Sequence, residues 1–147
     1  MNPQSRIVVG VDASPAAKSA LAWAVHEAKR INAPVLALSV SQPGAASERT
    51  HRHELAAAVD ALGTVADGVH IDQEVPHGLP GPTLVDRSVD ADLLVVGEHG
   101  YRKAGVLVMG SVTTHCLRKA HCPVVVVPLE GARHDGPLML RPETPVR

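Results

Sequence analysis

One loop of the sequence carries residue types that could bind a phosphorylated ligand. Gly97, Gly100 and Gly110 lie along it, and Ser111 follows at the expected start of a helix. Glycine lets a backbone approach a ligand closely, and the free N–H groups of a helix N-terminus attract anions. The pair Arg102–Lys103 adds positive charge to the same loop. Taken singly, each glycine could serve only a turn or a helix cap, but together they favour phosphate binding.

An acidic residue is predicted to lie across a cleft from this loop. Asp12 follows an apolar run that ends in Val11, and the helix-starting pair Ser14–Pro15 comes next. Ligands of open α/β sheets bind beyond the carboxyl ends of the strands, where the strand order reverses. Asp12 could therefore hold ribose hydroxyls or polar groups near an adenine, although it could also serve only the dipole of the following helix. We interpret the pattern as a nucleotide site.

The elements that position these residues alternate between strand and helix. Short apolar runs are typical of strands buried on both faces of a parallel sheet, and one half-polar run fits an edge strand. The predicted strands are Ile7–Val11, Val35–Val40, Val69–Val75, Leu93–Val96 and Val124–Val127. The predicted helices are 15–31, His53–Val65, Thr83–Val89 and Ser111–Ala120. This order predicts an α/β fold, an open parallel sheet with helices on both faces.

Composition bounds the classes of function. The 147 residues include 14 Lys and Arg against 15 Asp and Glu, one Trp, one Tyr and no Phe. A balanced charge and few aromatic rings argue against nucleic-acid partners and against binding to anionic lipid. No apolar run approaches the ~20 residues of a membrane span, and we expect a cytoplasmic protein. We expect one domain over residues 1–130 and an extended tail over 131–147. The apolar patch Leu138–Leu140 of this tail could dock on the body or on a partner, but we favour a frayed terminus.

Several blocks together resemble the universal stress protein family, in particular its ATP-binding subgroup. They are Gly97-x2-Gly100-x9-Gly110-Ser111 followed by Val112, the opening run from Ile7 to Asp12 with Ser14, the run from Asp90 to Gly97, and the run from Cys122 to Pro128. These blocks cover roughly residues 5–129 in the right order.

The resemblance implies a fold, a ligand and an assembly. The fold would be the adenine-nucleotide α-hydrolase-like sheet of five parallel strands in the order 3-2-1-4-5. The ligand would be ATP, or ADP or AMP, with Mg²⁺ or Mn²⁺ carried by the phosphates, and Val40 would offer its backbone to the adenine. The implied nucleotide-binding residues are Val11, Asp12, Val40, Val96, Gly97, Gly100, Gly110, Ser111 and Val112. Members commonly form homodimers through the last strand, here Val124–Val127.

Other side chains point less clearly to chemistry. The histidines are scattered, and His51 and His53 are spaced so that they would not share a helix face, so we expect no protein-held metal site. Cys116 and Cys122 fit buried apolar positions, with a redox role as the alternative. No nucleophile elbow or Walker loop is present, and we predict no catalytic residue, although His99 lies in the loop that could serve a slow ATPase.

The leading hypothesis from the sequence is an ATP-binding regulatory dimer with, at most, weak ATP hydrolysis. The alternative is a protein-interaction module of the same fold that acts through an unknown protein partner without nucleotide. The charged loop and the patch at Leu138 would carry that alternative function.

Overall fold

A computed structural model describes residues 5–44, 47–98, 101–103, 106–108, 110–128 and 138–139 of the chain. Its elements in chain order are β1 (Ile7–Gly10), α1 (Pro15–Ile31), β2 (Val35–Leu38), α2 (Glu48–Asp60), the 3-10 helix η1 (Gly63–Ala66), β3 (Ile71–Glu74), α3 (Pro80–Arg87), β4 (Leu93–Gly97), β5 (Tyr101–Lys103), β6 (Val106–Val108), α4 (Ser111–Lys119), β7 (Val124–Val127) and β8 (Leu138–Met139). Gly100, His99 and most of the predicted tail lie outside the described residues.

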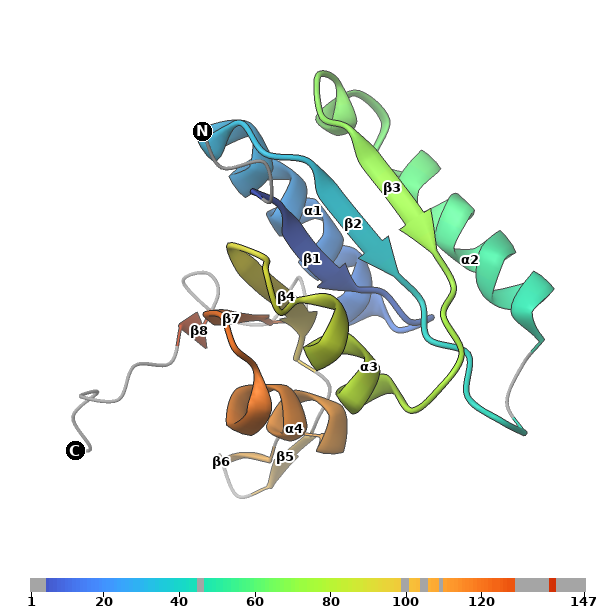
Figure 1. The fold of residues 1–147 in the computed structure, drawn as a ribbon, viewed down its shortest axis with the longest axis vertical. Helices are drawn as coiled ribbons and strands as arrows, with labels where there is room; N and C mark the ends of the chain where they lie inside the picture. The colour runs from blue at the N-terminus through green and yellow to red at the C-terminus, as the bar shows by residue number, and fades with distance from the viewer. Residues whose placement is uncertain are drawn as a thin grey trace.

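The main sheet has the strand order β3-β2-β1-β4-β7-β8 (Figure 1). All pairings among its first five strands are parallel. Counted in chain order, these strands have the predicted order 3-2-1-4-5, so the predicted fold is confirmed. The order reverses at β1, which lies between β2 and β4, and this reversal opens the cleft at the carboxyl ends of the strands.

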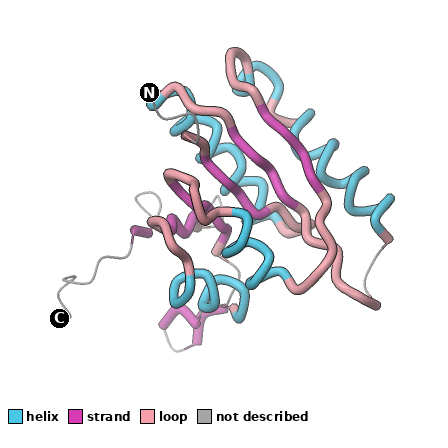
Figure 2. The backbone as a smooth tube through the Cα atoms, viewed as in Figure 1, coloured by secondary structure: helices cyan, strands magenta, loops and turns pink. Residues whose placement is uncertain are grey.

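Helices cover both faces of the sheet (Figure 2). Along β1, Ile7 and Val9 pack with residues of α1 and α2, whereas Val8 packs with residues of α3 and α4. Successive side chains of a strand point to opposite faces, so a nearly continuous apolar run supplies both cores. The sequence therefore places one aliphatic core on each side of the sheet.

Both ends of α1 are capped, the first by the predicted pair Ser14–Pro15. The Ser14 hydroxyl accepts a hydrogen bond from the N–H of Ala17, and Pro15 is the first helical residue. At the other end Asn32 has a φ of 57°, a left-handed conformation that Asn tolerates. These caps fix the direction in which α1 leaves Asp12.

The second predicted helix was misplaced. We expected it at His53–Val65, but α2 covers Glu48–Asp60 and a separate 3-10 turn, Gly63–Ala66, follows. The first turns of α2 are polar and mostly exposed, so they carry no apolar periodicity. The start is instead set by Ser47, whose hydroxyl accepts a hydrogen bond from the N–H of Thr50.

The third predicted helix, Thr83–Val89, starts earlier than expected. It runs from Pro80 to Arg87, with proline in its first turn. Gly81 lies inside this turn because α4 packs closely against it: a Cβ at Gly81 would lie 2.9 Å from Cγ of His115. Gly81 is therefore a packing position in the first turn of α3.

Three short strands were not predicted. The loop after β4 contains the antiparallel pair β5–β6, in which Tyr101 pairs with Val108. Leu138–Met139, part of the predicted tail, forms β8 and pairs antiparallel with Val125 and Val126 of β7. These two residues of the patch are therefore paired with the outer edge of β7, rather than frayed as we expected.

Candidate functional site

A cavity of about 250 Å³ opens at the carboxyl ends of β1, β2 and β4. This volume is near the lower end of the ~300–1,000 Å³ typical of small-molecule sites. Its described lining consists of Gly10, Val11, Asp12, Ser14, Ala17, Leu38, Ser39, Val40, Gln42, His51, Pro80, Leu84, Val96, Gly97, Val112 and Thr113. The walls are mainly aliphatic and carry a few polar groups, which is the usual composition of a site for a small organic ligand.

Six of the nine predicted site residues line this cavity. They are Val11, Asp12, Val40, Val96, Gly97 and Val112. Gly110 and Ser111 precede Val112 at the start of α4 but are not part of the described lining, and Gly100 lies outside the described residues. The prediction that Asp12 and Gly97 face one crevice agrees with this arrangement.

Asp12 contributes to the start of α1 and also borders the cavity. Its Oδ1 accepts a hydrogen bond of 2.8 Å from the N–H of Ser14, which shapes the entry into α1. Its side chain is exposed and borders the cavity. A carboxylate held in this way presents a negative charge at the mouth of the cleft, where it can accept hydrogen bonds from hydroxyl groups of a ligand.

Val40 lies two residues beyond the paired ends of β1 and β2, where Gly10 is opposite Leu38. The amides on either side of it bond toward β3: the N–H of Ser39 donates to Glu74 and that of Ser41 to Pro76. Within the described part of the chain, no group hydrogen-bonds to the N–H or C=O of Val40. An extended backbone turns these groups toward the opposite side, where β1 has ended and the cavity begins. Val40 therefore offers one donor and one acceptor to a ligand.

Gly97 lines the cavity and also packs too closely against α1 to carry a side chain. A Cβ at this position would lie 2.7 Å from the carbonyl oxygen of Ala16 in the first turn of α1. The hydroxyl of Thr113 donates a weak hydrogen bond of 3.4 Å to the carbonyl oxygen of Gly97. Gly97 thus brings the N-terminal ends of α1 and α4 together at the cavity.

The N-terminus of α4 presents backbone N–H groups that have no side-chain cap. Gly110 occupies the N-cap position without a side-chain cap, and Ser111 is exposed. The first N–H groups of an α-helix have no partner within the helix, and the helix dipole adds partial positive charge there. Because Val112 and Thr113 line the cavity, this helix end adjoins it.

Sequence reasoning missed the polar pair Ser39 and His51. Oγ of Ser39 lies 2.8 Å from Nδ1 of His51, which is in the first turns of α2, and both residues line the cavity. The misplaced start of α2 hid this pair, because it left His51 in a loop. Recognition of Ser47 as the N-cap would have placed His51 in the first turns of α2.

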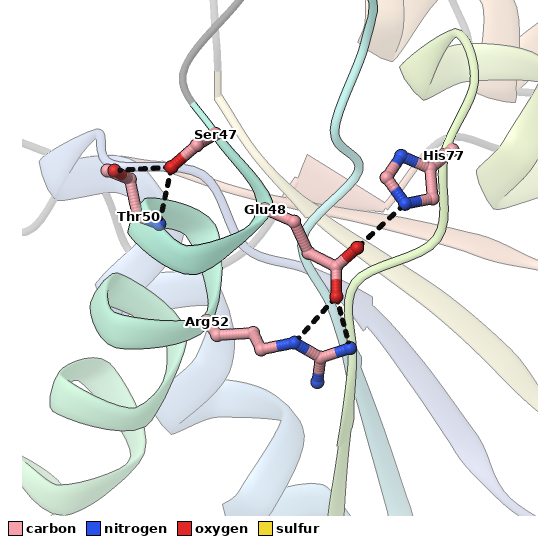
Figure 3. Close-up of polar contacts among 5 residues, drawn as sticks. All are labelled: Ser47, Glu48, Thr50, Arg52 and His77. Carbon is pink, nitrogen blue, oxygen red and sulfur yellow. Dashed lines mark hydrogen bonds and ion pairs between the residues drawn. The ribbon is translucent and has the colours of Figure 1, made fainter.

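A cluster of ion pairs holds the first turn of α2 in place (Figure 3). Oε1 of Glu48 lies 2.8 Å from Nε2 of His77, which is in the loop after β3, and its Oε2 lies 2.6 Å from Nη2 of Arg52. Hydrogen bonds with Arg52 and then His77 keep the pKa of the Glu48 carboxyl below its usual range. This cluster ties α2 to the β3–α3 loop next to His51.

The cysteines lie away from the cavity, in the core between the sheet and α4. Burial, with a smaller contribution from Cys122, raises the pKa of the Cys116 thiol to about 11. Burial also raises the pKa of Cys122. Protonated thiols react slowly with oxidants, so this environment does not favour the alternative redox role.

The described residues contain no cluster of metal-ligating side chains and no membrane-spanning helix. In that part of the chain, no group of three or more His, Cys, Asp or Glu side chains could hold a metal ion. None of its helices is long and apolar enough to cross a membrane.

Comparison with known proteins identifies the family. The sequence model of the "Universal stress protein family" matches residues 4–128, nearly all of the part that folds around the cavity. The chain belongs to the universal stress protein family.

Curated relatives of this family member include mycobacterial proteins. Universal stress protein Rv2624c of Mycobacterium tuberculosis is 36% identical over 131 residues, which cover 82% of this chain and 47% of the relative. The chain spans about half the length of the curated relatives it matches.

Solved structures of universal stress proteins share the fold. UspA from Lactobacillus plantarum is 29% identical with a TM-score of 0.65, over 84% of this chain and 97% of that one. A universal stress protein in complex with cAMP is 27% identical with a TM-score of 0.68, over 86% of this chain and 98% of that one.

Proposed function

We propose that this universal stress protein is a regulatory protein that binds an adenine nucleotide, ATP or one of its products, in the cavity at the carboxyl ends of β1, β2 and β4. The observation that carries the proposal is the backbone of Val40. Its N–H and C=O face a nucleoside-sized, mainly aliphatic cavity and have no partner in the described part of the chain. A donor and an acceptor side by side match the N1 and N6 atoms of adenine. The related protein solved with cAMP supports the same ligand class.

The remaining parts of the nucleotide follow from the direction of the cleft. With adenine at Val40, the ribose would lie near Asp12, and the phosphates would lie toward Gly97 and the N-terminus of α4. Asp12 is the one carboxylate among the described lining residues, so a divalent cation would be held mainly by the phosphates themselves.

We propose binding rather than turnover as the function and assign no catalytic residue. The acid at the cavity already bonds to the Ser14 amide, and the His51 imidazole lies beside Ser39, at the adenine end of the cleft. Neither is placed near the phosphate end, where a general base for hydrolysis would have to act.

Isothermal titration calorimetry of the full chain with ATP and Mg²⁺, AMP and cAMP tests the proposal. We expect saturable binding that Gly110→Glu weakens by about tenfold or more, because the added carboxylate faces the phosphates. Gly110 has a φ of −69°, which other residues adopt readily, so the variant should fold.

A matched control adds the same charge far from the cleft. Thr64→Glu places it on η1, an exposed turn that precedes β3 and so lies at the opposite end of the sheet. This variant should bind as the wild type does. An absence of heat and of any thermal shift with millimolar nucleotide would contradict the proposal.

We further propose that the protein forms a homodimer through β7 when β8 leaves the edge of that strand. The alternative function as a nucleotide-independent interaction module loses one of its supports, because the backbone of Leu138–Met139 is engaged with β7 in the same chain.

A further inference from the structure

One ring nitrogen at the cavity has no hydrogen-bonding partner. Nε2 of His51 is shielded from water and bonds to no group in the described part of the chain. A buried polar atom without a partner is unfavourable, because it has lost its hydrogen bonds with water and gained none in the protein. Most such atoms in proteins are paired. Because His51 lines the cavity, a bound molecule can supply the partner when the side chains that shield Nε2 move aside.

The other ring nitrogen shows how the histidine is held. Nδ1 of His51 bonds to Oγ of Ser39, which is almost fully buried, with 4% of its surface exposed. The Ser39 N–H in turn donates to the carbonyl oxygen of Glu74 in β3. The imidazole is therefore fixed to the sheet itself rather than to a loop.

The position of Ser39 decides which part of a ligand the histidine meets. Ser39 directly precedes Val40, the residue that we assign to the adenine, and the phosphate-binding end of the cleft is at α4, across β1. Gln42, another lining residue, lies on the same side as His51. The imidazole thus adjoins the nucleobase end of the cavity.

We propose that His51 contacts the nucleobase, with Nε2 as the hydrogen-bonding atom and Ser39 as the positioning residue. The inference rests on the proposed nucleotide-binding function and extends it to a side chain. A rotating hydroxyl can donate to Nδ1 or accept from it, and the choice sets whether Nε2 accepts or donates. The pair can therefore match either a donor or an acceptor on the base.

The anchoring cluster of Figure 3 supports this assignment. His51 lies between Glu48 and Arg52 on the first turns of α2, and Glu48 links these turns to His77. A helix end fixed in this way keeps the imidazole in place before the ligand arrives, which lowers the entropic cost of binding.

Two substitutions test the contributions of the two ring nitrogens separately. An Asn side chain places its amide near the position of Nδ1, and a Gln side chain reaches the position of Nε2. His51→Asn can keep the contact with Ser39 and lacks the nucleobase contact, whereas His51→Gln retains the nucleobase contact. Affinities for ATP, 2′-deoxy-ATP and inorganic tripolyphosphate are measured by calorimetry, and the melting temperature of each variant is measured without ligand.

We expect His51→Asn to weaken ATP and 2′-deoxy-ATP alike by about threefold to tenfold, the loss of one hydrogen bond. His51→Gln should recover part of this loss, and tripolyphosphate affinity should be unchanged in both variants. Without ligand His51→Asn should melt close to the wild type, because the lost atom has no partner. A purely structural histidine would instead lower the melting temperature of the free protein.

Three results would overturn the inference. They are wild-type ATP affinity in His51→Asn, an equal loss for tripolyphosphate, or a loss that vanishes with 2′-deoxy-ATP, which would assign the contact to the sugar. The proposed function fails separately, when the wild-type protein itself binds no adenine nucleotide.

Discussion

Gly97 lines the cavity and lies against the first turn of α1. We predict that Gly97→Ala destabilises the protein by about 1–3 kcal/mol, because the new Cβ meets the backbone oxygen of Ala16 at 2.7 Å and backbone cannot move aside cheaply. Urea unfolding followed by circular dichroism measures the loss.

Gly10 provides the matched comparison, because it also lines the cavity. A Cβ there would meet Cδ1 of Leu84 at 3.0 Å, and the end of a leucine side chain can rotate away. Gly10→Ala should therefore cost less than Gly97→Ala. Equal costs would show that the contact with Ala16 is not what requires glycine at position 97.

The two cysteines allow a test of burial at single side chains. The raised pKa of Cys116, about 11, leaves little thiolate at pH 8, so we predict that iodoacetamide labels it only as fast as the protein unfolds. Cys122 is half-buried and should react earlier. Mass spectrometry of timed samples, with urea-unfolded protein as the control, follows both sites. Fast labelling of Cys116 in the folded protein would contradict its buried environment.

Individual site residues differ in how well the sequence predicted them. Asp12 and Gly97 end apolar runs, and strand ends meet at one edge of a parallel sheet, so their shared cavity could be predicted. The pair Ser39 and His51 could not, because a polar contact between a strand end and a helix leaves no periodic pattern. The unpaired amide of Val40 lies beyond the end of the β1–β2 pairing, and apolar runs do not define where that pairing stops.

The ion-pair cluster at the start of α2 leads to a prediction at the scale of the element. The pKa of Glu48 is lowered in the folded protein, so its charge stabilises the protein above the unfolded-state pKa and this contribution is lost as the pH falls. We predict that Glu48→Gln lowers the melting temperature near pH 6 and that the difference from the wild type shrinks below about pH 4. Calorimetric melting across this range measures it.

Glu54 offers the control for this element. It lies on the exposed surface of the same helix, outside the cluster with His77 and Arg52. Glu54→Gln should leave the melting temperature close to the wild-type value throughout. A pH-independent difference for Glu48→Gln would show that loss of the Glu48 charge is not responsible for its effect.

Whole elements were predictable where burial imposes a pattern. Strands covered on both faces require nearly continuous apolar runs, and every predicted strand has bounds within two residues of the observed ones. The predicted start of α2 is too late because the first turns of this helix are polar. The predicted start of α3 is too late because prolines usually mark loops. The three-residue strands β5 and β6 and the two-residue strand β8 are too short to carry a periodicity of their own.

At the scale of the whole molecule, β8 covers the edge of β7 that the proposed dimer would use. We predict that ending the chain at residue 130 shifts the protein toward dimers, because it frees the backbone groups of an apolar edge strand. Size-exclusion chromatography with light scattering, over a range of concentrations, measures the shift. A dimer of equal stability with and without the segment would show that the two strands do not compete for this edge.

A point substitution separates the effect of pairing from that of chain length. Leu138 pairs with Val126, and proline at this position removes a backbone donor and disfavours a strand. Leu138→Pro in the full chain should shift the equilibrium in the same direction as the truncation. Identical behaviour of Leu138→Pro and the wild type would assign any effect of truncation to other residues of the tail.

The opposite edge of the sheet, β3, sets how far such an assembly can grow. Asp72 and Glu74 lie on this strand, and each forms an ion pair, with His70 and Arg87 respectively. Charged side chains along an outer strand disfavour the addition of another strand. If only one edge strand of a molecule can pair with another copy, assembly ends at the dimer. Uncovering β7 should therefore yield a closed pair of subunits rather than a fibre.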